Sequence, residues 1–274
     1  MLCVSGCGMS WRLRGLGLGR PVGRRRPGVG ASLAGISRFE NAKRRWQVAD
    51  VAGLLALYGV TGADRKRLLE MAENLDARAW VEPHEDVLRL RSALMAFEGR
   101  ARSLLNFSAG VVPGLLQTPA YARALHSVAG VTGEQQDEMV ETRMDRQTVL
   151  TKVACPQYVA IIDEAVFRRG YGGAEVMVQQ IDWLIGRAQQ PNISIHVIPF
   201  RHGGYACPGP FSMLGFADMP PLVFWEHGGL SGFLDASADT DLFQDAAARL
   251  MRFALGSADS VNFMTRMAAD YERG

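Results

Sequence analysis

The hydrophobic periodicity of this chain changes near residue 157, and this change limits the folds that the chain can adopt. Before it, apolar residues recur at the spacing of amphipathic helices. After it come short β-rich runs bounded by Pro, Gly or Asn, at 158–162, 193–198, 211–216 and 222–225. Helical patterns follow the first run (about 173–189) and close the sequence (about 239–255 and 257–271). The pattern predicts an α+β fold, with a mostly helical N-terminal half and then a mixed α/β domain whose small sheet has about four or five strands.

The N-terminal half contains helix-start signals that place its helices. Thr61 and Asp64 have a spacing like that of a capping box, and a helical pattern follows to about residue 78. A longer pattern covers about 84–105, with Glu98 and Arg102 at i, i+4 spacing. Thr118 and Pro119 predict the N-cap and first residue of a helix that ends near residue 127. A last helix is predicted from Thr132 to about residue 152.

Basic residues are concentrated at the start of the chain. Residues 1–45 hold ten Arg or Lys and one acidic residue, Glu40, whereas the remainder holds 20 basic and 27 acidic residues. This asymmetry suits a chain that contacts nucleic acid at one end only. Residues 1–30 contain eight Gly and six Arg and show no helical pattern, so a disordered segment is expected there.

A short helix and a basic turn are predicted at residues 32–45. Ser32 can cap a helix to about Glu40 whose apolar residues, spaced three apart, face inward. Small polar residues and one arginine occupy the opposite face, as docking into a major groove requires, and a basic turn beside the phosphates follows. The predicted DNA-contacting residues are Ser32, Gly35, Ser37, Arg38, Asn41, Lys43, Arg44 and Arg45.

The string SLAGISRFENAKRR (32–45) resembles the recognition helix and following turn of the Cro/repressor-like helix-turn-helix family. Residues 47–58 resemble the next helix of that domain. The resemblance implies binding of double-stranded DNA. The two preceding helices of such a domain are absent from the pattern of residues 1–30, which a frameshifted or wrongly assigned start would explain. A recognition helix of about nine residues is unstable alone, so sequence-specific DNA binding by this chain is expected to be weak or absent.

A second resemblance covers about residues 47–271. It is carried by VPGLLQTPAYAR (112–123), by Arg143 with Arg146-Gln147, by Glu164-Ala165 with Arg168-Arg169, and by the run 180–199. These strings are similar to the C-terminal domain of unknown function that follows a helix-turn-helix in many actinobacterial, antitoxin-like transcriptional regulators. The resemblance implies a small partner protein encoded nearby.

These patterns give four predicted segments. Residues 1–30 form the disordered segment, and 31–78 form a truncated helix-turn-helix module. Residues 79–108 form a connecting helix, and 109–274 form the α+β domain that binds an effector or partner. Homodimerisation is left open.

No apolar run is long enough to cross a membrane, and the start lacks the features of a signal peptide, so a cytoplasmic location is expected.

Polar residues within apolar surroundings are the candidate ligand or partner site. They are Tyr121, Arg143, Arg146, Glu164, Arg168 and Glu226. An ion pair between Arg146 and Glu164 that fixes a helix to the sheet is the structural alternative. The binding interpretation fits a regulator that senses a small molecule or a protein.

An enzyme is the third hypothesis, after the regulator and a stand-alone interaction module without DNA binding. His202, Cys207, Glu226 and His227 are the residues that would support a hydrolase or a metal enzyme. No ordered catalytic motif accompanies them. Cys3 and Cys7 form half of a zinc spacing, without a second pair. The prediction is therefore a non-enzymatic protein without a metal or other cofactor.

Overall fold

The structure is a computed structural model, and it describes residues 2–5, 8–11, 52–53, 55–56, 60–62, 64–66, 69, 80–83, 87–227 and 230–274. The chain divides into two compact units. One comprises Met1–Trp80 with Asp235–Asp239, and the other comprises Val81–Leu234 with Thr240–Gly274. In the described part of the chain, no helix has the length and apolar character needed to cross a membrane.

The first unit contains a short antiparallel strand pair. Its strands are β1 (Leu2–Ser5) and β2 (Gly8–Trp11). They lie in the Gly/Arg-rich segment, for which the sequence predicts no regular structure. Apolar residues alternate with small ones in both strands, and this alternation favours extended backbone over the disorder expected for the segment.

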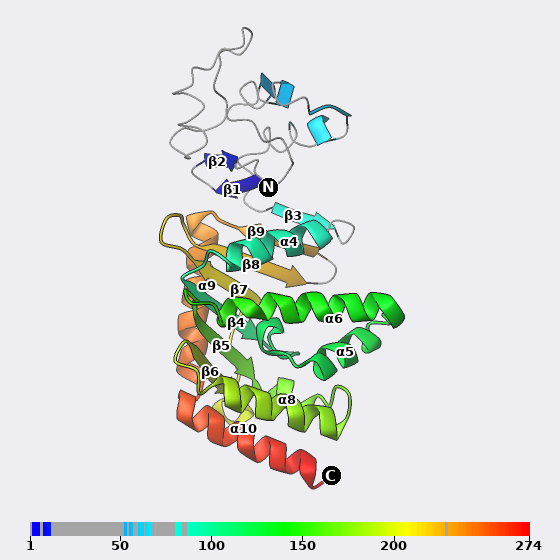
Figure 1. The fold of residues 1–274 in the computed structure, drawn as a ribbon. Coiled ribbons are helices and arrows are strands. Elements are labelled where there is room, and N and C mark those ends of the chain that lie inside the picture. Colours follow the sequence, from blue (N-terminus) through cyan, green and yellow to red (C-terminus); the bar gives the residue numbers. More distant parts are fainter. Residues whose placement is uncertain are drawn as a thin grey trace. The chain divides into compact units, whose positions relative to one another are not determined.

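Seven strands form the main sheet, in the order β3-β9-β8-β7-β4-β5-β6 (Figure 1). They are β3 (Trp80–Pro83), β4 (Ser103–Ser108), β5 (Gln157–Asp163), β6 (Ile193–Ile198), β7 (Phe211–Gly215), β8 (Leu222–His227) and β9 (Leu230–Leu234). Strands β4, β5 and β6 are parallel to one another, whereas the pairs β4–β7, β7–β8 and β8–β9 are antiparallel. The predicted α+β class is confirmed, and the sheet is larger than predicted.

Opposite faces of this sheet contact different helices. On one face, Phe211 of β7 packs edge-on against Phe243 of α9 (Ser237–Phe253), with ring centroids 5.0 Å apart. The strand register pairs Phe211 with Trp225 on that face and places Phe224 and Phe233 on the other. There Phe233 contacts Phe97 of α4 (Val87–Glu98) at 5.2 Å. The sheet is therefore the middle layer between α9 and α4 (Figure 1).

The main core lies between α9 and the sheet. Its buried members are Phe107, Ile161, Ile198, Phe211, Val223, Phe243, Ala246, Ala247 and Leu250. Each strand residue in this set alternates with a neighbour on the opposite face, which is the period-2 pattern that the sequence shows. This core fixes the position of the strands that carry the polar residues described below.

Two helices connect the parallel strands β5 and β6, and a third lies beside them. The connecting helices are α7 (Glu164–Arg168) and α8 (Ala174–Arg187), and α10 (Ser257–Glu272) packs against α8 and β6. Strand β6 is at the edge of the sheet. There the Val197 N–H donates to Ser260 Oγ (3.0 Å), and Val197 O accepts from the Leu255 N–H (2.8 Å). These bonds satisfy part of an otherwise open edge.

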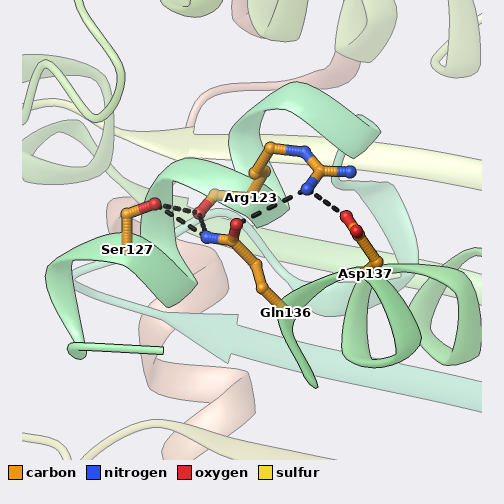
Figure 2. Close-up of polar contacts among 4 residues, drawn as sticks. All are labelled: Arg123, Ser127, Gln136 and Asp137. Atoms are coloured by element: carbon orange, nitrogen blue, oxygen red, sulfur yellow. Dashed lines mark hydrogen bonds and ion pairs between the residues drawn. The ribbon is translucent and has the colours of Figure 1, made fainter. Parts of the chain in front are cut away.

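Helices α5 (Pro119–Val128) and α6 (Gly133–Gln147) form a hairpin held by polar side chains (Figure 2). Gln136 Nε2 donates to Arg123 O (3.0 Å) and to Ser127 Oγ (2.7 Å). Arg123 Nη1 donates to Gln136 Oε1 (3.4 Å) and pairs with Asp137. Thr118 is the N-cap of α5, as predicted, because its Oγ1 accepts from the Tyr121 N–H (3.3 Å).

The helix predicted over about 84–105 is shorter in the structure. Helix α4 ends at Glu98, and Ser103–Ser108 is the strand β4 in the interior of the sheet. Gly99, directly after Glu98, marks the end of the helix in the sequence, but the apolar run SLLNFS after it also fits a continued helical pattern. Residues that the sequence assigns to a connecting helix therefore supply a sheet strand, and β3 and β9 are two further strands that the pattern missed.

Candidate functional site

The VPGLLQT segment (112–118) is a buried loop. Val112, Leu115 and Leu116 are at most 1% exposed, and the short 3-10 helix η2 (Gly114–Leu116) lies within it. A buried loop leaves backbone N–H and C=O groups that need hydrogen-bond partners. Gln117 supplies one, since its Nε2 donates to Val112 O (2.6 Å).

Glutamines from two helices satisfy further backbone groups of this loop. Gln147 Nε2 on α6 donates to Gly114 O (3.1 Å) and to Gln117 O (2.7 Å). Gln180 on α8 is fully buried; its Nε2 donates to Leu116 O (2.8 Å), and its Oε1 accepts from the Thr118 N–H (2.7 Å). The loop is thus joined to α6 and α8 by amide side chains.

Tyr121 and Arg143, two predicted ligand residues, also hold this loop. The Tyr121 hydroxyl is buried and accepts from the Val112 N–H (3.2 Å), and burial raises the pKa of this tyrosine. Arg143 Nη1 donates to Gln117 Oε1 (2.7 Å). These contacts give both residues a structural role in positioning the VPGLLQT segment.

Arg146 is paired with Glu98. Its Nε and Nη2 donate to the two carboxylate oxygens of Glu98, each at 2.7 Å. Burial by itself lowers the pKa of Arg146. The hydrogen bond and the negative charge of Glu98 have a larger, opposite effect, so the pKa of Arg146 is raised. The charge of Glu226, which is exposed on β8, adds to this rise. The alternative of an Arg146–Glu164 ion pair is therefore wrong, and the predicted i, i+4 spacing of Glu98 with Arg102 is not the pairing that forms.

A polar chain on the sheet lies near this ion pair. Tyr158 is 1% exposed, and its hydroxyl donates to Asn106 Oδ1 (2.7 Å). Asn106 Nδ2 in turn donates to Ser212 Oγ. Burial raises the pKa of Tyr158, and the Glu98 carboxylate raises it further. The arrangement links strands β4, β5 and β7, and Tyr158 is a neutral donor at physiological pH.

Glu164 and Arg168 lie in a different part of the domain. Arg168 Nε and Nη2 donate to Glu164 Oε1 (3.0 and 2.8 Å), and Glu164 Oε2 accepts from the Phe200 N–H (2.9 Å). The Glu164 side chain is 9% exposed and that of Arg168 is 52% exposed. Glu164 therefore anchors the chain after β6, and it holds an exposed guanidinium beside a cleft.

This cleft, which we call the arginine cleft, has a volume of about 410 Å³. Its arginines are Arg168 of α7, Arg201 of η4 (Phe200–His202), Arg266 of α10, and Arg273 directly after α10. The buried Phe263 and Met267 side chains also line it, and Asp270 is its acidic residue. Four guanidinium groups in one cleft make it the strongest candidate in the described residues for binding a charged ligand.

A family model for a domain of unknown function, DUF5753, matches residues 91–266. The chain belongs to this family. The match confirms the C-terminal domain of unknown function that the VPGLLQT resemblance implies. A search of curated proteins found no match. The DUF5753 match contains the VPGLLQT loop, its anchoring side chains and three of the four arginines of the cleft.

Two residues of the enzyme hypothesis, His202 and Cys207, each contact a backbone carbonyl. His202 Nδ1 lies 2.6 Å from Phe253 O, and Cys207 Sγ donates to Gly209 O (3.2 Å). Burial raises the pKa of the Cys207 thiol, which opposes formation of a nucleophilic thiolate. Within the ranges that the structure describes, no three His, Cys, Asp or Glu side chains are grouped to hold a metal ion.

The sequence missed most of the cleft and of the buried polar pairs. Arg201, Arg266 and Arg273 were not predicted as site residues, and neither was Glu98 or Gln180. One signal was readable: Arg266, Asp270 and Arg273 have the i, i+4, i+7 spacing of one helix face. The eight predicted DNA-contacting residues lie outside the described residues.

Proposed function

We propose that the protein is an antitoxin-like transcriptional regulator whose DUF5753 domain binds a partner protein or a ligand. The observation that carries the proposal is the presence in one chain of a Cro/repressor-like segment, Ser32–Arg45, and a DUF5753 domain. The charge distribution supports it, because the basic residues of the first 45 positions would contact phosphates while the acidic remainder would not.

DNA recognition would use the residues on one face of the 32–40 segment and the basic turn after it. Ser37 and Arg38 would reach base edges, whereas Lys43, Arg44 and Arg45 would contact phosphates. The proposal includes weak binding by this chain, because residues 1–30 show no pattern of two amphipathic helices that would support the recognition helix.

The proposal is of a non-enzymatic protein that acts in the cytoplasm, without a metal or other cofactor. His202 and Cys207 are each engaged with a backbone carbonyl, and the raised pKa of the Cys207 thiol disfavours nucleophilic catalysis. The partner would be a small protein encoded nearby, and a homodimer is compatible with the same role.

A stand-alone interaction module is the second candidate function. The Gly/Arg-rich composition of residues 1–30 favours it, since a chain that lost sequence-specific DNA binding could retain partner binding through the DUF5753 domain. One observation would separate the two candidates: whether the DNA upstream of the gene, read in another frame, encodes the missing helices.

Mobility shift with the full chain tests the proposal directly. Duplex DNA from the region upstream of the gene is titrated at low and at physiological salt. We expect weak, salt-sensitive binding that falls with Arg38→Ala and with Lys43→Ala, while the exposed Arg102→Ala control in the DUF5753 domain has no effect. Binding unaffected by Arg38→Ala and Lys43→Ala, or no binding at low salt, would favour the interaction module.

A further inference from the structure

We propose that the arginine cleft binds a small phosphorylated molecule. The proposal rests on the ligand-binding part of the proposed function and names the class of ligand, and it requires neither DNA binding nor a partner protein. It rests on the geometry, charge and volume of the cleft.

Three separate elements bring the four arginines together. Arg168 ends α7, Arg201 lies in η4, Arg266 lies in α10, and Arg273 follows the last residue of α10. The chain positions of Arg168 and Arg273 differ by 105 residues, so their convergence is a property of the tertiary fold. Asp270 of α10 lies between Arg266 and Arg273 in the sequence, at the i, i+4, i+7 spacing of one helix face.

The guanidinium charges are only partly neutralised within the domain. Arg168 is paired with Glu164, and Arg273 Nη2 donates to Asp270 Oδ1 (2.5 Å). Among the residues that the structure describes, Arg201 and Arg266 have no carboxylate or hydrogen-bond partner. Two positive charges that line the cleft therefore remain uncompensated within the domain.

This concentration of positive charge contrasts with the rest of the domain. Residues 81–274 contain 16 Arg or Lys and 22 Asp or Glu. A negatively charged domain repels an extended polyanion such as duplex DNA, but a small anion can enter a local basic cleft. The overall charge thus favours a small ligand over a nucleic acid.

Phosphate is the anion that best matches the uncompensated arginines. A phosphate group carries about −1.5 to −2 charge at neutral pH and three acceptor oxygens, whereas a carboxylate carries a single charge. Guanidinium groups bind phosphate through two parallel N–H donors. The volume of about 410 Å³ lies in the range of small-molecule sites, and Phe263 and Met267 offer an apolar wall for the remainder of the ligand.

Calorimetric titration of the full chain with sodium pyrophosphate tests this assignment. At constant ionic strength, we expect saturable binding of one pyrophosphate per chain that weakens at least about ten-fold in Arg201→Ala/Arg266→Ala. Both side chains are exposed, so this variant should fold. The charge-matched control is Arg102→Ala/Lys152→Ala, which removes two exposed positive charges away from the cleft and should bind like the unmodified chain.

Three results would overturn the proposal. The first is pyrophosphate binding that is equal in the cleft variant and the unmodified chain, which would assign it to basic residues elsewhere. The second is the absence of saturable binding. The third is malonate, a dicarboxylate, binding as tightly as pyrophosphate at the same arginines. Failure of the DNA mobility shift would leave these outcomes unchanged, so the two proposals fail independently.

Discussion

Arg146 and Glu98 form a two-point ion pair, 48 residues apart in sequence, that joins helix α6 to the end of helix α4. Both bonds measure 2.7 Å, and the exposed fractions of the two side chains are 22% and 4%. A buried carboxylate with both oxygens engaged is stable only while its partner remains. This pair therefore controls whether α6, which holds the VPGLLQT loop, stays in place.

Replacement of Arg146 should destabilise the domain strongly. Arg146→Ala leaves the Glu98 carboxylate buried and unpaired, and a loss of about 3–5 kcal/mol in the free energy of unfolding is expected. Urea unfolding followed by circular dichroism measures it. The matched control is Arg123→Ala on the exposed Arg123–Asp137 pair, which should cost about 1 kcal/mol or less. Equal effects of the two substitutions would contradict the structural role of the buried pair.

Replacement of Gln180 should destabilise the domain as strongly as replacement of a buried core residue. Gln180→Leu keeps the approximate volume of the side chain but leaves Leu116 O and the Thr118 N–H without their partner. Each buried unsatisfied group costs about 1–3 kcal/mol, so a total of about 2–6 kcal/mol is expected in urea unfolding. Gln179→Leu on the exposed face of the same helix is the control and should change stability by about 0.5 kcal/mol or less.

Alkaline pH should destabilise the domain through its buried tyrosines. Burial raises the pKa of Tyr158 above its ordinary value of 10.0, so the unfolded chain loses this proton at a lower pH than the folded chain does. Stability from this group is fully present below pH 10.0 and falls as the pH rises above it, by about 1.4 kcal/mol per pH unit. Urea midpoints across this range should decline less steeply in Tyr158→Phe, and identical slopes would contradict the prediction.

Cys207 should react slowly with alkylating reagents in the folded protein. Burial raises the pKa of its thiol above the ordinary 9.0, and only the thiolate reacts. Mass spectrometry of iodoacetamide-treated protein at neutral pH should show slower modification of Cys207 in the folded chain than in urea, with the rate still rising above pH 9.0. Fast alkylation at neutral pH in the folded state would instead support the enzyme hypothesis.

Local sequence patterns predicted most elements of the DUF5753 domain. Strand β6 and helices α5, α8 and α10 lie within a few residues of their predicted bounds because hydrophobic period and cap residues act over short distances. Strand β4 was missed because its six residues continue an apolar pattern that also fits a helix. Its pairing with β5 and β7 decides its conformation.

The candidate site was harder to predict than the fold. The sequence singles out Tyr121, Arg143 and Arg146 as polar residues among apolar ones, but their partners, Val112, Gln117 and Glu98, could not be inferred from spacing. Glu164 and Arg168 were the exception, since i, i+4 neighbours on a helix meet through local geometry alone.

The sequence by itself determined the α+β class, the position of most helices and strands, the basic segment at the start and the family of the larger domain. Each of these depends on the order of neighbouring residues or on short strings. Only the tertiary structure decided which charged groups far apart in the chain form pairs and which lack a partner. Arg146 meets Glu98 rather than Glu164, and Arg168, Arg201 and Arg266 share one cleft, because packing of the helices on the sheet joins segments that lie far apart in the chain.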